Sequence, residues 1–231
     1  MRAHGSRDTL VVATGNRGKL EELRALLAGL PLRVLGVSEV LRDPPRVVED
    51  GATFVENAVK KAREVARATL MWTLADDSGL EVDALGGRPG VRSARFAHER
   101  ATDAENNAAL LAELGALSDP VSGELPGELA GEDGFRARFR CVLALVDPFT
   151  GNGEPRTVEG VCEGTVTRAP RGSGGFGYDP LFVVAGTDRT MAELSEQEKN
   201  RLSHRAKAFM ALQPVLTSIL EARAAQVSRL G

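Results

Sequence analysis

The chain has 231 residues, 42% of them hydrophobic, which is enough for one large or two small domains with a sizeable core. Its formal net charge of −3 provides no basic field for nucleic acid, and no apolar run approaches the ~20 residues of a membrane span. We therefore expect neither nucleic acid nor a membrane as a partner. The amino terminus lacks the apolar segment of a signal peptide, which favours a cytoplasmic location.

The first predicted unit is a strand, a loop and a helix. Residues 9–13 form a continuous β-branched and apolar run, typical of a strand covered on both faces. Leucines recur at helical spacing from Leu20 to Leu30. The connecting loop consists of Thr14, Gly15, Asn16, Arg17, Gly18 and Lys19. Because a helix amino terminus attracts anions, and because Arg17 and Lys19 are cationic, the loop is a candidate phosphate site.

This loop does not match a Walker motif. The spacing from Gly15 to Gly18 is too short, and Leu20 stands where Ser or Thr would bind magnesium. A different phosphate loop and a tight turn that binds nothing both remain open.

A second helix is predicted to follow residues 53–56, Thr-Phe-Val-Glu, which have the form of a capping box, and to extend to about Thr69. Its apolar residues form one stripe, whereas Lys61 falls with Asn57 on another flank. Lys61 is therefore either a solvated surface lysine or a phosphate contact. Glu49, just upstream, is a candidate metal ligand.

Asp76 and Asp77 mark the candidate catalytic centre. We expect residues 71–75 to form a short buried strand, so that both carboxylates fall at its carboxyl end, where α/β sheets bind ligands. Ser78 and Gly79 would then turn the chain into a second strand over residues 80–83. Neighbouring carboxylates repel unless a cation lies between them or one takes a proton, which favours a divalent ion. A plain Asp-Asp-Ser-Gly turn is the alternative.

The middle of the chain is predicted to contain a helix, an insertion and two paired strands. Residues 104–114 have a helical pattern, and residues 118–135, rich in Gly, Pro, Ser and acids, are expected to form a flexible surface insertion. The paired strands are predicted over 137–146 and 156–167. Glycines 160 and 164 predict a bulge or sharp bend in the second of them.

The last third carries a glycine-rich loop at residues 172–180. Phe176, Tyr178 and Asp179 suit an aromatic platform and a polar reader for a planar ligand, with a plain flexible loop as the alternative. A second capping box at 195–198 begins another helix. Close to it lie three side chains that favour an acceptor-rich ligand: Lys199, His204 and Arg205.

Five motifs occur in one order along the chain. They are Ala13-Thr-Gly-Asn-Arg-Gly-Lys19; Glu49-Asp-Gly with Phe54-Val-Glu-Asn-Ala-Val-Lys-Lys-Ala-Arg63; Ala75-Asp-Asp-Ser-Gly-Leu-Glu-Val-Asp-Ala-Leu-Gly-Gly87; Gly174-Gly-Phe-Gly-Tyr-Asp-Pro180; and Ala192-Glu-Leu with Glu198-Lys199 and Ser203-His-Arg205. In this order they resemble the Ham1/inosine triphosphatase family, which includes the bacterial dITP/XTP pyrophosphatases. The acidic insertion and a slightly extended amino terminus depart from the pattern without touching a motif.

The resemblance implies one α/β domain over residues 1–231. It implies an elongated mixed central sheet flanked by helices, two lobes with the active-site cleft between them, and a homodimer. The implied activity is Mg²⁺-dependent hydrolysis of the α–β phosphoanhydride of deaminated purine nucleoside triphosphates (ITP, dITP and XTP) to monophosphate and pyrophosphate, which cleanses the nucleotide pool.

The resemblance also implies residue roles. Asp77 matches the proton acceptor and metal ligand, with Glu49 as the second metal ligand. Asp76 supports them, and Lys61 matches a catalytic lysine that contacts phosphate. The residues that match substrate contacts are Thr14, Gly15, Asn16, Arg17, Gly18, Lys19, Ser78, Phe176, Gly177, Tyr178, Asp179, Lys199, His204 and Arg205.

Selectivity is expected at the base edge. Lys199 and Arg205 can donate to the 6-keto group of hypoxanthine or xanthine, whereas the amino group of adenine would leave those buried cations unmatched. Two other functions are considered: a Maf-like nucleotide pyrophosphatase, and a nucleotide sensor that does not hydrolyse. The second would be expected to lack an acidic ligand or a phosphate lysine, yet Glu49, Asp77 and Lys61 are all present.

Overall fold

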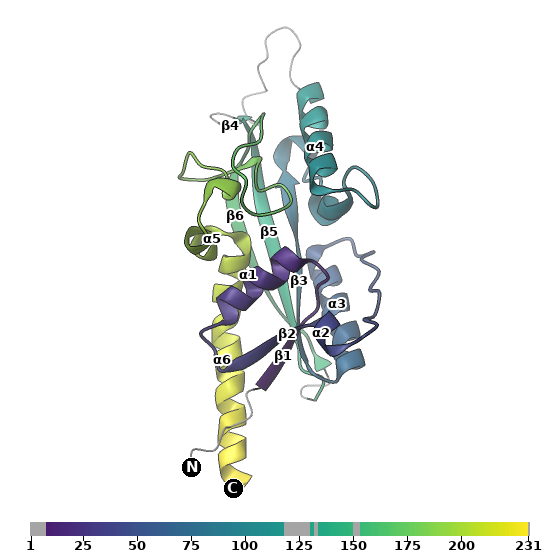
Figure 1. Cartoon of the computed structure of the whole chain (residues 1–231), viewed down its shortest axis with the longest axis vertical. Helices are drawn as coiled ribbons and strands as arrows, with labels where there is room; N and C mark the ends of the chain where they lie inside the picture. Colours follow the sequence, from purple (N-terminus) through teal and green to yellow (C-terminus); the bar gives the residue numbers. More distant parts are fainter. Residues whose placement is uncertain (1–7, 118–129, 132–133, 150–152, 231) are drawn as a thin grey trace.

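One mixed β-sheet organises the computed structural model, which describes residues 8–117, 130–131, 134–149 and 153–230 (Figure 1). The strands are β1 (Asp8–Val12), β2 (Leu32–Gly36), β3 (Trp72–Val82), β4 (Ala130–Gly131), β5 (Gly134–Val146), β6 (Arg156–Val166) and β7 (Phe182–Val184). The α-helices are α1 (Arg17–Leu27), α2 (Val37–Val40), α3 (Phe54–Thr69), α4 (Asp103–Leu117), α5 (Glu196–Leu202) and α6 (His204–Leu230). Short 3-10 helices are η1 (Asp83–Leu85), η2 (Gly90–Arg95) and η4 (Met191–Glu193). None of the helices described here is long and apolar enough to cross a membrane.

The strand order is β2-β1-β3-β5-β6-β7, and β4 pairs with β5. Strand β1 runs parallel to both β2 and β3, whereas β5 runs antiparallel to β3 and β6. Leu10, Val11 and Val12 of β1 are completely buried, as expected for a strand covered on both faces. The predicted α/β class with a mixed central sheet is confirmed.

Three apolar clusters fill the molecule and divide it into two lobes. In the first lobe, α3 covers one face of β1, β3 and β5, while α1 and α6 cover the other face. In the second lobe, the distal halves of β3, β5 and β6 pack with α4, β7 and the chain that precedes α5. Figure 1 shows the long strands β3, β5 and β6 running through both lobes along the longest axis of the molecule. The sheet therefore joins the two lobes directly.

The prediction of two short strands separated by a turn at Ser78 and Gly79 was wrong. Strand β3 is continuous, and its pairing with β5 runs from Thr73 opposite Val146 to Val82 opposite Ala137 without a break. Turn-favouring residue types are overridden here because each has a strand partner. Gly79 has another role, since a Cβ at this position would overlap Ser93 Oγ. The glycine allows η2 to lie directly against the strand.

Strand β1 ends beside the two aspartates. Its pairing with β3 stops at Val12 opposite Leu74, and the chain then enters the loop that leads to α1. Asp76 and Asp77 consequently lie at the carboxyl edge of the parallel part of the sheet, although they are in the middle of β3. The expected crevice is present, and it arises from the end of a neighbouring strand.

The predicted bulge in β6 was also wrong. The register between β5 and β6 stays constant from Phe135 opposite Val166 to Leu145 opposite Arg156. A Cβ at Gly160 would overlap backbone atoms of His204 and Ala208. Gly160 thus allows α6 to lie directly on the sheet. Glycines within strands often mark such a close approach of another backbone.

The boundaries of the predicted insertion at 118–135 need correction. Gly134 and Phe135 belong to β5, and Ala130 and Gly131 form β4, which pairs with them. The rest of that segment lies outside the described residues. The helix starts were predicted more accurately: Thr53 with Glu56, and Ser195 with Glu198, form the expected capping boxes of α3 and α5.

We expect Gly160→Ala to destabilise the protein by about 1–3 kcal/mol or more, because the added methyl group forces α6 away from β6. Urea unfolding monitored by circular dichroism measures this. Gly115→Ala in α4 is the matched control. No heavy atom lies within 4 Å of a Cβ there, and alanine should stabilise the helix by up to about 1 kcal/mol. Equal unfolding midpoints for Gly160→Ala and the wild type would contradict this packing role.

Candidate active site

Asp76 and Asp77 point to opposite faces of β3, because successive residues of a strand alternate between its faces. Asp76 faces α1 and α6, where its carboxylate lies 2.6 Å from Lys19 Nζ and 2.8 Å from Arg205 Nε. Asp77 faces α3, where its Oδ1 lies 2.8 Å from Lys61 Nζ. The predicted sharing of one cation between the two aspartates is therefore wrong: each carboxylate has its own cationic partner on its own side of the sheet.

The Asp76 carboxylate is ionised and holds Lys19 and Arg205 in place. Burial alone would raise the pKa of this carboxyl, but Arg205 and Lys19 outweigh burial and hold the pKa well below its usual range. Ser78 Oγ donates to Asp76 Oδ1 at 2.9 Å, and the Cys141 thiol donates to Oδ2 at 3.1 Å. With these partners, Asp76 keeps its charge and has little capacity to accept a proton.

Asp77 has the opposite character. Burial raises the pKa of this carboxyl, and the attraction of Lys61 and Lys19 offsets the effect only in part. Its Oδ1 accepts a hydrogen bond from Lys61, while its buried Oδ2 has no hydrogen-bond partner among the described residues. A raised pKa and an unused acceptor oxygen are the properties of a general base or a cation ligand.

Lys61 joins Asp77 to Glu49. Its Nζ lies 2.8 Å from Asp77 and 3.2 Å from Glu49 Oε1, and its side chain is only 10% exposed. Although burial alone would lower the pKa of this ammonium, Asp77 and Glu49 raise it above its usual value. The interpretation of Lys61 as a solvated surface lysine is thus excluded.

Asp77 and Glu49 fit a magnesium site that a ligand completes. The described residues contain no cluster of three or more acidic, histidine or cysteine side chains that could form a complete protein cage. Mg²⁺ commonly binds through one or two carboxylates together with substrate phosphates and water. The buried, unpartnered Oδ2 of Asp77 agrees with such a site.

The residues of the loop at the start of α1 have different roles: some stabilise the start of the helix, and others lie near the pocket. Asn16 Oδ1 accepts from Lys19 N at 3.0 Å and caps the helix, while Thr14 Oγ1 accepts from Asn16 N at 3.1 Å. The exposed Arg17 pairs with Glu21 at 2.8 Å on the outer surface, so its side chain does not reach the pocket. A Cβ at Gly15 would have no heavy atom within 4 Å. A Cβ at Gly18, in contrast, would lie 2.6 Å from the Phe176 ring.

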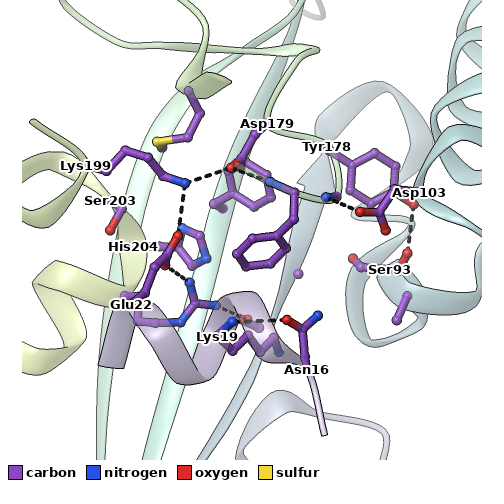
Figure 2. Close-up of a pocket in the computed structure, with 18 of the residues that line it drawn as sticks. Asn16, Lys19, Glu22, Ser93, Asp103, Tyr178, Asp179, Lys199, Ser203 and His204 are labelled. Carbon is purple, nitrogen blue, oxygen red and sulfur yellow. Dashed lines mark hydrogen bonds and ion pairs between the residues drawn. The ribbon is translucent and has the colours of Figure 1, made fainter. Parts of the chain in front are cut away.

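A pocket lined by aromatic, cationic and acidic side chains opens between the two lobes (Figure 2). It is lined by Asn16, Lys19, Glu22, Ser78, Gly79, Ser93, Ala94, Asp103, Asn106, Phe139, Phe176, Gly177, Tyr178, Asp179, Met191, Lys199, Ser203, His204 and Arg205. Ten predicted substrate-contact residues are in this set. Thr14, Gly15, Arg17 and Gly18 are outside it, and so are Asp77, Lys61 and Glu49 on the other side of β3.

Ion pairs organise one wall of the pocket. Glu22 accepts from Lys199 Nζ at 2.9 Å and also pairs with Arg205, and Lys199 lies 2.9 Å from Asp179 (Figure 2). Phe176 lies within cation–π distance of both cations. The expectation that adenine would leave Lys199 and Arg205 unmatched therefore needs correction, because carboxylates pair with both cations without any ligand.

His204 is a neutral side chain of this pocket. Burial lowers the pKa of its imidazole well below the usual value, and the neighbouring Arg205 lowers it further. The ring stacks on Phe139 with centroids 4.8 Å apart, and Nδ1 is buried without a partner among the described residues. A neutral ring with an unused nitrogen is suited to hydrogen bonding with a ligand.

Several residues at the site were not predicted from the sequence, among them Glu22, Ser93, Asp103 and Asn107. Glu22 lies one turn after Lys19 on the same side of α1, a spacing that could have identified it. Asp103 accepts from Gly177 N at 2.7 Å, and Asn107 donates to Gly177 O at 3.0 Å, so α4 holds both backbone polar groups of this glycine. Ser93 O accepts from the Tyr178 hydroxyl at 2.9 Å. These last three contacts have no local sequence signal.

Comparisons with known proteins find similarity along most of the chain. The sequence model of the Ham1 family matches residues 10–215. The dITP/XTP pyrophosphatase of Geobacter sulfurreducens is 48% identical over 88% of this chain and 94% of its own length, and that of Streptomyces coelicolor is 45% identical over 91% and 98%. A HAM1 protein from Coxiella burnetii superposes with a TM-score of 0.76 at 42% identity, covering 91% of this chain and 99% of that structure.

We expect Asp76→Asn to destabilise the fold by about 3–5 kcal/mol at pH 7, because Arg205 and Lys19 would each lose a buried carboxylate partner. The lowered pKa of Asp76 stabilises the folded state above the unfolded pKa of about 3.9, and this contribution is lost as pH falls further. The difference between variant and wild type should therefore shrink below about pH 4.

Urea unfolding at several pH values tests this expectation. Asp77→Asn is the matched control, since Asp77 has fewer partners and its replacement should cost less stability. A loss for Asp77→Asn equal to that for Asp76→Asn would contradict the different roles of the two carboxylates.

Proposed function

The chain belongs to the Ham1 family, and on this basis we propose that it is a nucleoside triphosphate pyrophosphatase acting on deaminated purine nucleotides. The substrates are ITP, dITP and XTP, the products are the monophosphate and pyrophosphate, and the role is cleansing of the nucleotide pool. The observation that carries the proposal is Asp77, with its raised pKa and unpartnered oxygen, beside Lys61 and Glu49 on the side of β3 opposite the pocket. A homodimer, which rests on the family resemblance, and a cytoplasmic location belong to the same proposal.

In the proposed reaction a water oxygen attacks the α-phosphorus, and the bond from that phosphorus to the bridging oxygen breaks. The electron pair leaves with pyrophosphate. The Asp77 carboxylate accepts the proton of the water. Lys61 and Lys19 stabilise the negative charge that accumulates on the phosphates.

Magnesium has a defined place in this proposal. Asp77 and Glu49 would hold Mg²⁺, which when bound polarises phosphoryl oxygens and neutralises their charge. Lys61 lies between these two carboxylates and keeps them together in the absence of the cation.

Base selection rests on the donors that remain on the cations. Lys199 has three N–H donors, of which Glu22 and Asp179 take two among the described residues. Arg205 has five, and its described partners are Asp76, Glu22 and Ser78. Both side chains therefore retain donors for a keto oxygen and offer no acceptor to an adenine amino group.

We expect the purified protein with Mg²⁺ to convert ITP, dITP and XTP to monophosphate and pyrophosphate, and to leave ATP and GTP largely intact. Chromatographic separation of monophosphate, diphosphate, pyrophosphate and phosphate measures both the bond cleaved and the base preference. Tight nucleotide binding without products would indicate a sensor. Diphosphate with inorganic phosphate would mean that a different phosphorus is attacked.

Asp77→Asn should reduce kcat by a factor on the order of 10²–10⁴ while the protein stays folded, because the amide cannot accept the proton. In the wild type, kcat should fall at low pH as Asp77 becomes protonated, because only the ionised carboxylate can accept the proton. Initial rates at saturating ITP across pH, with circular dichroism as the folding control, measure both effects. Near-normal turnover by the folded variant would exclude Asp77 as the base.

A further inference from the structure

The candidate metal ligand Glu49 lies in a segment, residues 42–52, that contains no helix or strand. No backbone–backbone hydrogen bond joins these residues to another described part of the chain. The position of Glu49 therefore depends on side chains that reach the segment from neighbouring elements.

Five such contacts hold the segment, and four of them come from α3. Gly51 N donates to Asn57 Oδ1 at 2.8 Å, Ala52 N donates to Glu56 Oε2 at 2.7 Å, and Asp50 pairs with Lys60 at 2.6 Å. Lys61 pairs with the Glu49 carboxylate itself at 3.2 Å. The fifth contact comes from a distant part of the sequence: Arg95 Nη2 donates to the backbone carbonyl of Glu49 at 2.6 Å. A charged donor makes a stronger hydrogen bond than a neutral one, so this contact is well suited to fix Glu49.

Arg95 is the last residue of η2, and η2 is fixed to both β3 and the pocket. Ser93 Oγ accepts from Leu80 N at 2.9 Å and donates to Gly90 O at 2.7 Å. Ser93 O accepts from the Tyr178 hydroxyl, and Ser93 lines the pocket (Figure 2). Two residues further on, Arg95 reaches Glu49, so one short helix contacts both the pocket and the segment that carries the candidate metal ligand.

We propose that Arg95 is a positioning residue, which holds the Glu49 backbone and thereby sets where the Glu49 carboxylate stands relative to Asp77 and Lys61. This role rests on the proposed function, in which Glu49 is a metal ligand. Arg95 does not line the pocket, and no contact joins it to Asp77 or Lys61 among the described residues. It therefore acts through Glu49, and its loss should weaken the use of Mg²⁺ more than the binding of the nucleoside.

The test compares Arg95→Ala with Arg92→Ala. Arg92 lies on the same 3-10 helix and pairs with Glu99 at 2.9 Å, and Arg95 also approaches Glu99, at 3.8 Å. Arg92 makes no described contact with residues 42–52, so its replacement removes the same charge without releasing Glu49. Arg95→Lys, which retains a cationic donor, is the conservative variant and should restore part of the lost function.

Two kinds of measurement are needed. The first is the Mg²⁺ concentration for half-maximal ITP hydrolysis, together with kcat and the KM for ITP at saturating Mg²⁺. The second is hydrogen exchange of peptides that cover residues 42–53, measured without metal or nucleotide. For Arg95→Ala we expect an Mg²⁺ requirement raised about tenfold or more, a lower kcat, a nearly unchanged KM and faster exchange in this segment. Arg92→Ala should match the wild type in all of these.

Unchanged exchange of residues 42–53 in Arg95→Ala would overturn the positioning role, whatever the activity. A normal Mg²⁺ requirement in Arg95→Ala would also overturn the positioning role, provided that Glu49→Gln raises the Mg²⁺ requirement. If Glu49→Gln itself leaves the Mg²⁺ requirement unchanged, the proposed metal role of Glu49 fails, and the role of Arg95 toward the metal fails with it. Wild-type exchange rates outside residues 42–53 show that the variants are folded. If Arg95→Ala does not fold, Arg95→Met takes its place, because methionine keeps the length of the side chain and cannot donate a hydrogen bond.

Discussion

The buried ion pairs of Asp76 are the interaction on which the rest of the site depends. They join β3 to Lys19 of α1 and to Arg205 of α6, residues from opposite ends of the chain. Leaving one of these charges buried without a partner would be strongly destabilising, so the three elements are constrained to stay together. This constraint fixes the orientation of β3. Because side chains alternate along a strand, it also fixes Asp77 on the opposite face, toward α3.

Two adjacent carboxylates of one strand thereby differ in their acid–base properties. Asp76 is saturated with donors and has a lowered pKa, whereas Asp77 has a raised pKa and an unused oxygen. Opposite shifts in neighbouring titratable groups are a recurrent sign that one is structural or electrostatic and the other reacts. In the proposed pyrophosphatase, Asp76 orders the cations of the nucleotide pocket and Asp77 activates water on the other side of the strand.

The same division explains why both sides of β3 are needed. The pocket on the Asp76 side holds aromatic and cationic groups suited to a purine nucleoside, while Lys61 and Glu49 lie on the Asp77 side. A triphosphate that reaches from one to the other must pass the edge where β1 ends. The helix η2 touches both regions, through Ser93 at the pocket and Arg95 at Glu49. In the proposed function, base recognition and metal binding therefore both involve elements that contact η2.

The sequence by itself determined the family, the helix starts and most of the residue types of the site. Capping boxes and apolar runs are local signals, so α3, α5 and β1 could be predicted from neighbouring residues alone. The continuity of β3 could not be predicted, since turn-favouring residues were overridden by pairing with a distant strand. Only the tertiary structure decided that Lys61 is buried and that Arg95 holds Glu49, because both depend on which segments meet across the sheet.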